Sequence, residues 1–79
     1  MHNIFEVTLH LTGYATLKAI LKWCAANTSE FDTTSPADND LDEACFIRNL
    51  LDSGTVETRF YFFEETEAML FKLTFAEYL

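Results

Sequence analysis

The chain has 79 residues, a length that suits one domain spanning residues 1–79 around a single hydrophobic core. Apolar residues make up 49% of it, with eight Phe, three Tyr and one Trp, and this composition excludes a disordered chain. Thirteen Asp and Glu against five Lys and Arg give a net charge of -8, which argues against direct binding to nucleic acid or to an anionic membrane. No apolar run approaches the roughly 20 residues of a membrane span, and no secretory signal pattern is visible, so we expect a cytoplasmic protein with reduced cysteines.

The first predicted element is a half-buried strand over residues 4–11, because apolar and polar side chains alternate along it. Thr12-Gly13 ends this strand. From Tyr14 to about Ala26 the apolar residues recur at helical spacing, which predicts a helix. Residues 27–35 are polar, and we expect them to form a loop.

A second helix is predicted from Ser35 to about Asp52. Ser35 suits the N-cap, Pro36 the first helical position and Asp38 the acidic position of a capping box. Gly54 follows the helix and would end it in the left-handed conformation that glycine adopts easily.

The last third of the chain predicts a β-hairpin, with strands over residues 55–63 and 68–75 joined by residues 64–67. Pairing Phe63 with Ala68 puts nearly all large apolar side chains on one face. The predicted fold is therefore α+β, with a three-stranded, mainly antiparallel sheet and two helices on one face, in the order strand–helix–helix–strand–strand.

Few residues in the chain are suited to catalysis or metal binding. His2 lies at the terminus, and His10 lies on the polar face of the first strand. Cys24 falls within the apolar stripe of the first helix and resembles a buried apolar residue. Residues 38–42 begin like a calcium loop, but the glycine and the glutamate that complete such a loop are missing. We therefore predict no enzyme, no catalytic residue, no cofactor and no metal.

The acidic residues predict a protein-binding site. If the second helix runs antiparallel to the strand that follows it, the start of that helix lies beside the hairpin tip. Nine carboxylates then form one acidic pole: Glu30, Asp32, Asp38, Asp40, Asp42, Glu43, Glu64, Glu65 and Glu67. Carboxylates on a rigid frame can occupy the Arg and Lys sites of a partner that otherwise bind phosphates. The competing interpretation is that these acids serve solubility and local helix capping.

A second candidate surface is apolar. Tyr61, Phe63 and Leu70 are expected on the outward face of the hairpin, where the helices leave them uncovered. A homodimer through this face, or through an unpaired strand edge, is a further alternative.

These features favour a protein-binding inhibitor or adaptor that blocks a basic, nucleic-acid-binding surface of a partner protein. In size, charge and lack of catalytic residues, the chain resembles small acidic phage proteins that inhibit host defence, of the anti-CRISPR or DNA-mimic type. This resemblance is one of type and rests on no shared motif. The alternative is a non-catalytic, antitoxin-like or homo-oligomeric structural subunit that binds through the aromatic sheet face.

Overall fold

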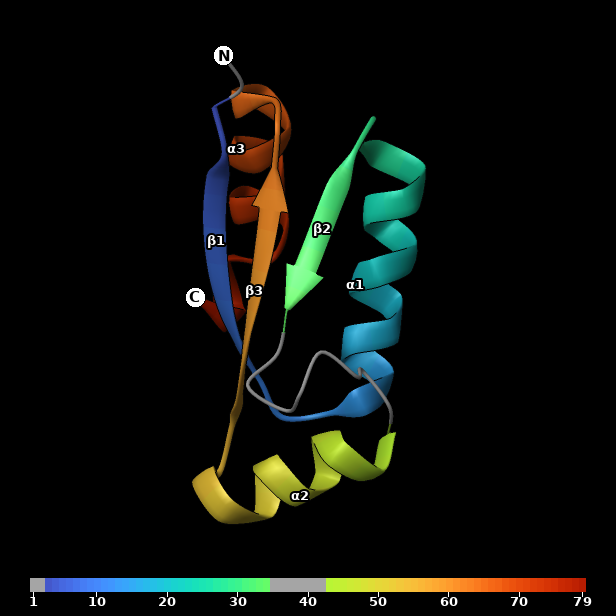
Figure 1. Ribbon diagram of the computed structural model, residues 1–79, viewed down its shortest axis with the longest axis vertical. Helices are drawn as coiled ribbons and strands as arrows, with labels where there is room; N and C mark the ends of the chain where they lie inside the picture. Colours follow the sequence, from blue (N-terminus) through green and yellow to red (C-terminus); the bar gives the residue numbers. More distant parts are fainter. Residues whose placement is uncertain (1–2, 35–42) are drawn as a thin grey trace.

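The structure is a computed structural model that describes residues 3–34 and 43–79. Its centre is a three-stranded antiparallel sheet in the order β1-β3-β2 (Figure 1). The strands are β1 (Phe5–Leu11), β2 (Phe31–Thr34) and β3 (Val56–Phe62). The last strand in the sequence therefore lies in the middle of the sheet and pairs with both of the others. An α+β fold with an antiparallel sheet is confirmed.

Helices follow each strand, and they differ in how they meet the sheet. They are α1 (Tyr14–Asn27), α2 (Glu43–Ser53), α3 (Glu65–Thr74) and the short 3-10 helix η1 (Ala76–Tyr78). Figure 1 shows α1 and α3 on the same side of the sheet, whereas α2 crosses the end of the molecule where β3 begins. Within the described part of the chain, no helix covers the opposite side of the sheet.

The core lies between the sheet and the pair α1 and α3. Alternate side chains of β3 are buried, and the same holds for the last three core-facing positions of β1. The ring of Phe71 on α3 is fully buried against them, with centroids 4.9 Å from Phe60 and 4.7 Å from Phe62. Trp23 of α1 also contacts Phe71, with ring centroids 5.9 Å apart. Each fully buried ring contributes roughly 1.5–3 kcal/mol to folding, so these aromatic residues hold the two helices to the sheet.

The predicted hairpin is wrong, because residues 65–74 form helix α3 and not a second strand. Ala68 and Phe71 are buried and Phe75 is half-buried, which is the three- and four-residue spacing of a helix face. Glu65 and Glu67 lie in the first turn of α3, where carboxylates interact favourably with the helix dipole. The predicted element order, with only two helices, is therefore incorrect.

Two further predictions can be compared with the structure. Residues 31–34, expected in a loop, form the short strand β2 at the sheet edge. The predicted cap of the second helix, Ser35 with Pro36 and Asp38, lies outside the described residues. The end of that helix is confirmed: α2 stops at Ser53, and Gly54 follows with a φ of 81°, while its N–H donates to the Leu50 carbonyl at 2.8 Å.

Candidate functional site

The uncovered face of the sheet carries a central arginine held by two carboxylates. Arg59 of β3 lies 3.3 Å from Glu57 (Nη2 to Oε1) and 3.6 Å from Glu6 of β1 (Nε to Oε1). The hydrogen bond to Glu57 is the main cause that raises the pKa of Arg59, and a hydrogen bond with Tyr61 adds to it. All these side chains are partly or largely exposed, so the guanidinium stays charged and oriented on an accessible surface.

Tyr61 lies between two acidic residues on the same face. The register pairs Tyr61 with Glu6 of β1 on one side and with Asp32 of β2 on the other. Directly paired residues of neighbouring strands have Cβ atoms roughly 4.5–5.5 Å apart, so both carboxylates lie beside the phenol ring. Aromatic rings and carboxylates both attract cations. This part of the face therefore combines an aromatic ring with two carboxylates, next to the guanidinium of Arg59.

The strand β3 stops at the end of the molecule where α3 begins (Figure 1, top). Pairing of Phe31 with Phe62 puts the start of β2 beside the end of β3, and α3 begins three residues later. The N–H of Ser29 donates to Oε2 of Glu67 at 3.0 Å, and its hydroxyl lies 3.3 Å from Oε1. We call this region the acidic end, which consists of Glu6, Glu30, Asp32, Glu64, Glu65 and Glu67.

The acidic end contains part of the predicted acidic pole. Glu30, Asp32, Glu64, Glu65 and Glu67 belong to two segments that meet there, the start of β2 and the start of α3, although the topology predicted for their proximity is wrong. Their proximity comes from the pairing of β2 with β3, and not from a helix beside a hairpin tip.

The remaining members of the predicted pole do not join it. Glu43 begins α2 at the opposite end of the molecule, because α2 crosses the end of the sheet and does not run along β3 (Figure 1). Asp38, Asp40 and Asp42 lie outside the described residues. Glu6 was missed as a member, although the alternation of the first strand already put it on the polar face.

The predicted apolar face does not form as expected. Tyr61 is half-buried on the uncovered side of the sheet, and Phe63 follows directly after β3. Leu70 belongs to α3, on the other side of the sheet, so it cannot share a surface with Tyr61. The exposed apolar side chains of α3 are Met69, Leu70 and Leu73, with exposed fractions of 55%, 47% and 77%.

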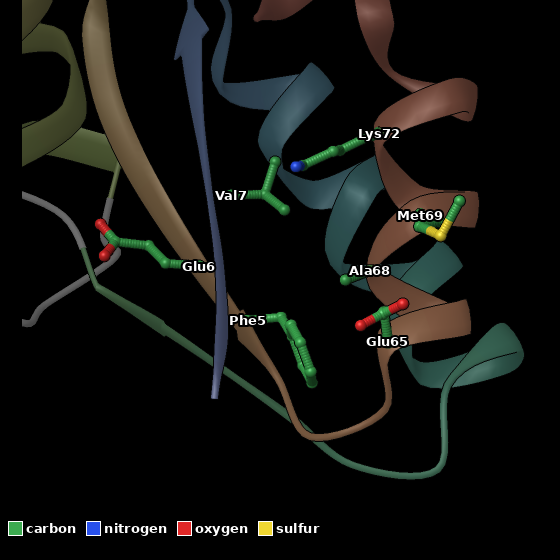
Figure 2. Close-up of a pocket in the computed structure, with 7 residues that line it drawn as sticks. All are labelled: Phe5, Glu6, Val7, Glu65, Ala68, Met69 and Lys72. Carbon is green, nitrogen blue, oxygen red and sulfur yellow. The ribbon is translucent and has the colours of Figure 1, made fainter. Parts of the chain in front are cut away.

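A groove runs between β1 and α3 (Figure 2), with a volume of about 280 Å³. Its lining residues are Phe5, Glu6 and Val7 of β1 and Glu65, Ala68, Met69 and Lys72 of α3. Figure 2 shows Phe5 and Val7 pointing toward α3, while the carboxylate of Glu6 points away to the uncovered face. The ammonium of Lys72 reaches across the groove toward Val7. The groove is thus apolar at its base with one charge of each sign on its helical side.

One potentially nucleophilic side chain, Cys24 of α1, is buried. Burial raises the pKa of Cys24 from 9.0 to about 12, which keeps this thiol protonated and unreactive near neutral pH. Across residues 3–34 and 43–79, no group of three or more His, Cys, Asp or Glu side chains could hold a metal ion. Over the same ranges, no helix has the length and apolar character needed to cross a membrane.

Comparison with protein-family models, with curated proteins and with solved structures finds no match for this chain.

Proposed function

We propose that this protein is a non-catalytic inhibitor or adaptor, which binds a basic surface of a nucleic-acid-binding partner protein through the acidic end and the uncovered sheet face. One observation carries the proposal. Carboxylates from segments more than 30 residues apart converge at one end of the molecule, with Ser29 bonded to Glu67 across 38 positions. Local helix capping accounts for Glu65 and Glu67, but it does not account for Glu30, Asp32 and Glu6 beside them.

Four of the six charges of the acidic end are held by regular structure. Glu6 and Asp32 project from paired strands, and Glu65 and Glu67 from the first turn of a helix. A rigid array of carboxylates loses little conformational entropy when it binds a cation. Its free energy of binding is therefore more favourable than that of the same charges on a flexible acidic tail. Carboxylates fixed in this way can occupy guanidinium and ammonium sites that otherwise receive phosphate groups.

Tyr61 supplies the aromatic group that an electrostatic contact needs for affinity. Charges at the rim of an interface mainly accelerate encounter, whereas buried aromatic and arginine side chains carry most of the binding energy. With Glu6 and Asp32 on its two sides, Tyr61 would receive an Arg or Lys side chain of the partner by stacking and charge together.

A second candidate function rests on α3. Met69, Leu70 and Leu73 are large apolar side chains that this helix exposes on its outer surface. Such a surface is typical of an interface, and it would suit an antitoxin-like or homo-oligomeric subunit whose acids serve solubility alone. Salt separates the candidates, because electrostatic binding weakens steeply with ionic strength and apolar binding does not.

The test begins with affinity capture and cross-linking of the tagged protein in cells of its source organism. The captured partner is then purified, and its binding to fluorescent double-stranded DNA is titrated with this protein. We expect mutually exclusive binding, with DNA released stoichiometrically. A partner that holds both ligands at once, or that has no basic surface, would contradict the proposed function.

A further inference from the structure

One edge of β1 has no strand partner among residues 3–34 and 43–79. Within the described part of the chain, β1 pairs with β3 alone, on one of its two edges. In an antiparallel strand, alternate residues direct their N–H and C=O groups to the outer edge. These groups can pair with an added strand, which is a common mode of peptide recognition. The 3-10 helix η1 also contacts β1, but the groove lies beside Phe5 and Val7, at the N-terminal half of the strand.

The groove lies directly beside this edge and offers space for side chains. Its base is formed by Phe5, Val7, Ala68 and Met69, and its volume of about 280 Å³ is enough for a few aliphatic side chains. Met69 is 55% exposed there, so further contact would remove apolar surface from water. An unpaired strand edge beside an apolar groove fits an extended chain better than a helix or a compact ligand.

We propose that this edge and groove bind an extended segment of the partner protein, which joins the sheet as a fourth strand beside β1. This inference rests on the proposed function for the sign of the partner's charge. Beyond that function, it specifies that the bound segment of the partner is extended, and it specifies the order of its apolar and basic residues. Side chains of an added strand alternate between the two faces of the sheet. One set enters the groove, and the other lies on the uncovered face beside Glu6.

The charges around β1 define the pattern further. Glu6 projects onto the uncovered face, where its side chain is 49% exposed and lies 3.6 Å from Arg59. Lys72 and Glu65 put one charge of each sign along the groove, so its charges select neither a cation nor an anion, and its apolar base selects apolar side chains (Figure 2). Basic side chains therefore belong at positions of the segment that face Glu6, and apolar ones at the positions between them. The segment that fits is an alternation of apolar and basic residues.

A second copy of this chain fits the same edge less well. In a twofold dimer, β1 would pair with β1 of the other molecule. The register that brings Glu65 of each molecule to Lys72 of the other would put the twofold axis near Glu6. Each Glu6 would then face its own copy, and like charges directly opposite each other destabilise a sheet. The net charge of -8 on each molecule adds to this repulsion. An occupant with basic side chains avoids both costs.

The experiment uses a phage-displayed library of random peptides of about ten residues, since a strand rises about 3.3 Å per residue and β1 is short. Peptides selected on the full chain are synthesised, and their affinities are measured by fluorescence anisotropy. We expect apolar residues at every second position with Lys or Arg between them. Met69→Gln should weaken binding about tenfold, whereas Leu73→Gln, an exposed residue of the same helix outside the groove, should leave affinity unchanged.

Strand addition makes a second, independent prediction with its own control. Methylating alternate backbone nitrogens of a selected peptide should abolish binding for the set that faces β1 and preserve it for the other set. Equal effects of both sets, or equal effects of Met69→Gln and Leu73→Gln, would overturn the inference. Sedimentation equilibrium that shows a dimer dissociated by Met69→Gln would also overturn it, in favour of a second copy.

The outcome is separable from that of the proposed function. If selected peptides bind in the groove but lack basic residues and resist high salt, strand addition stands, and the basic partner fails. The captured partner could instead bind the Met69→Gln variant and the parent chain equally well, with both still displacing DNA. The proposed function then stands, and the groove is not the contact with the partner.

Discussion

The backbone N–H of Ser29 donates to a carboxylate oxygen of Glu67 at 3.0 Å, and this bond joins the turn after α1 to the first turns of α3. The hydroxyl of Ser29 lies 3.3 Å from the other carboxylate oxygen. The contact fixes the start of β2 relative to α3. It thereby holds two acidic segments, residues 30–32 and 64–67, at the same end of the molecule.

Glu67→Ala removes both of these contacts and leaves the N–H of Ser29 to water. We expect a loss of about 1 kcal/mol in the free energy of unfolding, as for a partly exposed hydrogen bond to a charged group. Glu67→Gln keeps an acceptor oxygen and should lose less, while Glu64→Ala serves as the exposed control on the same segment. Urea denaturation followed by circular dichroism measures all three. An equal effect of Glu64→Ala and Glu67→Ala would contradict a structural role for this contact.

Phe71 and Leu73 distinguish helix α3 from a strand. Phe71 is fully buried among the rings of Phe60, Phe62 and Trp23, so Phe71→Ala should cost about 3–5 kcal/mol. Leu73 is 77% exposed on α3, and Leu73→Ala should change stability by less than about 0.5 kcal/mol. In a hairpin both side chains would be buried on the same face, and both substitutions would be severe. Thermal melts of the two variants decide between the structures.

The elements with a strong pattern could be predicted from sequence. The first strand, the first helix and the end of the second helix at Gly54 follow directly from alternation, helical spacing and a glycine cap. Residues 71–75 also alternate in polarity, but Glu, Ala, Met, Leu and Lys favour helix, and residues 64–67 contain no Gly or Asn for a tight turn. Those two signals were present in the sequence and outweigh the alternation.

The acidic end could be predicted only in part. Its members in residues 30–32 and 64–67 were identified by charge, but their proximity depends on β2, which has four residues, two of them threonine. A strand this short gives no clear periodicity, and its place in the sheet is decided by pairing with β3. Glu43 was placed wrongly because the direction of α2 is set by its packing across the sheet end and not by the length of its connection to β3.

Gly54 has a φ of 81°, which is the left-handed region that side chains disfavour. A Cβ at this position would meet no atom within 4 Å, so substitution causes backbone strain without a steric clash. We expect Gly54→Ala to cost about 1 kcal/mol and Gly54→Asn less, because Asn tolerates this conformation better. Denaturant titration tests this order. Equal stability of Gly54→Ala and the parent would show that the turn relaxes.

Cys24 should make stability depend on alkaline pH. Its pKa is raised by burial to about 12 in the folded protein, against 9.0 for an unperturbed thiol. Between these values the unfolded chain loses the proton and the folded protein keeps it, so stability falls as pH rises, by at most about 1.4 kcal/mol per unit. Below pH 9 this thiol contributes no pH dependence.

Cys24→Ala provides the comparison for this effect. The variant should be less stable at pH 7, because it leaves a small cavity, but its stability should decline less steeply between pH 9 and 12. Denaturant titrations at a series of pH values measure both slopes. Parallel slopes for variant and parent would show that the thiolate is not excluded from the fold.

The central claim is that the acidic end, and not total charge, directs binding to a basic partner. Two double charge reversals that change net charge equally separate these possibilities. The first variant, Glu30→Lys with Glu64→Lys, alters the acidic end. The second variant, Glu43→Lys with Asp52→Lys, alters α2 at the opposite end of the molecule. All four side chains are exposed. Circular dichroism checks that both variants fold.

The decisive measurement is the association rate of each variant with the purified partner across a salt series. We predict that the acidic-end reversal slows association at least about tenfold at low salt, and that the α2 reversal slows it far less. The difference should vanish near 1 M salt, where the screening length falls to about 3 Å. Equal rates for the two variants at low salt would contradict the account, because the acids would then act only through net charge.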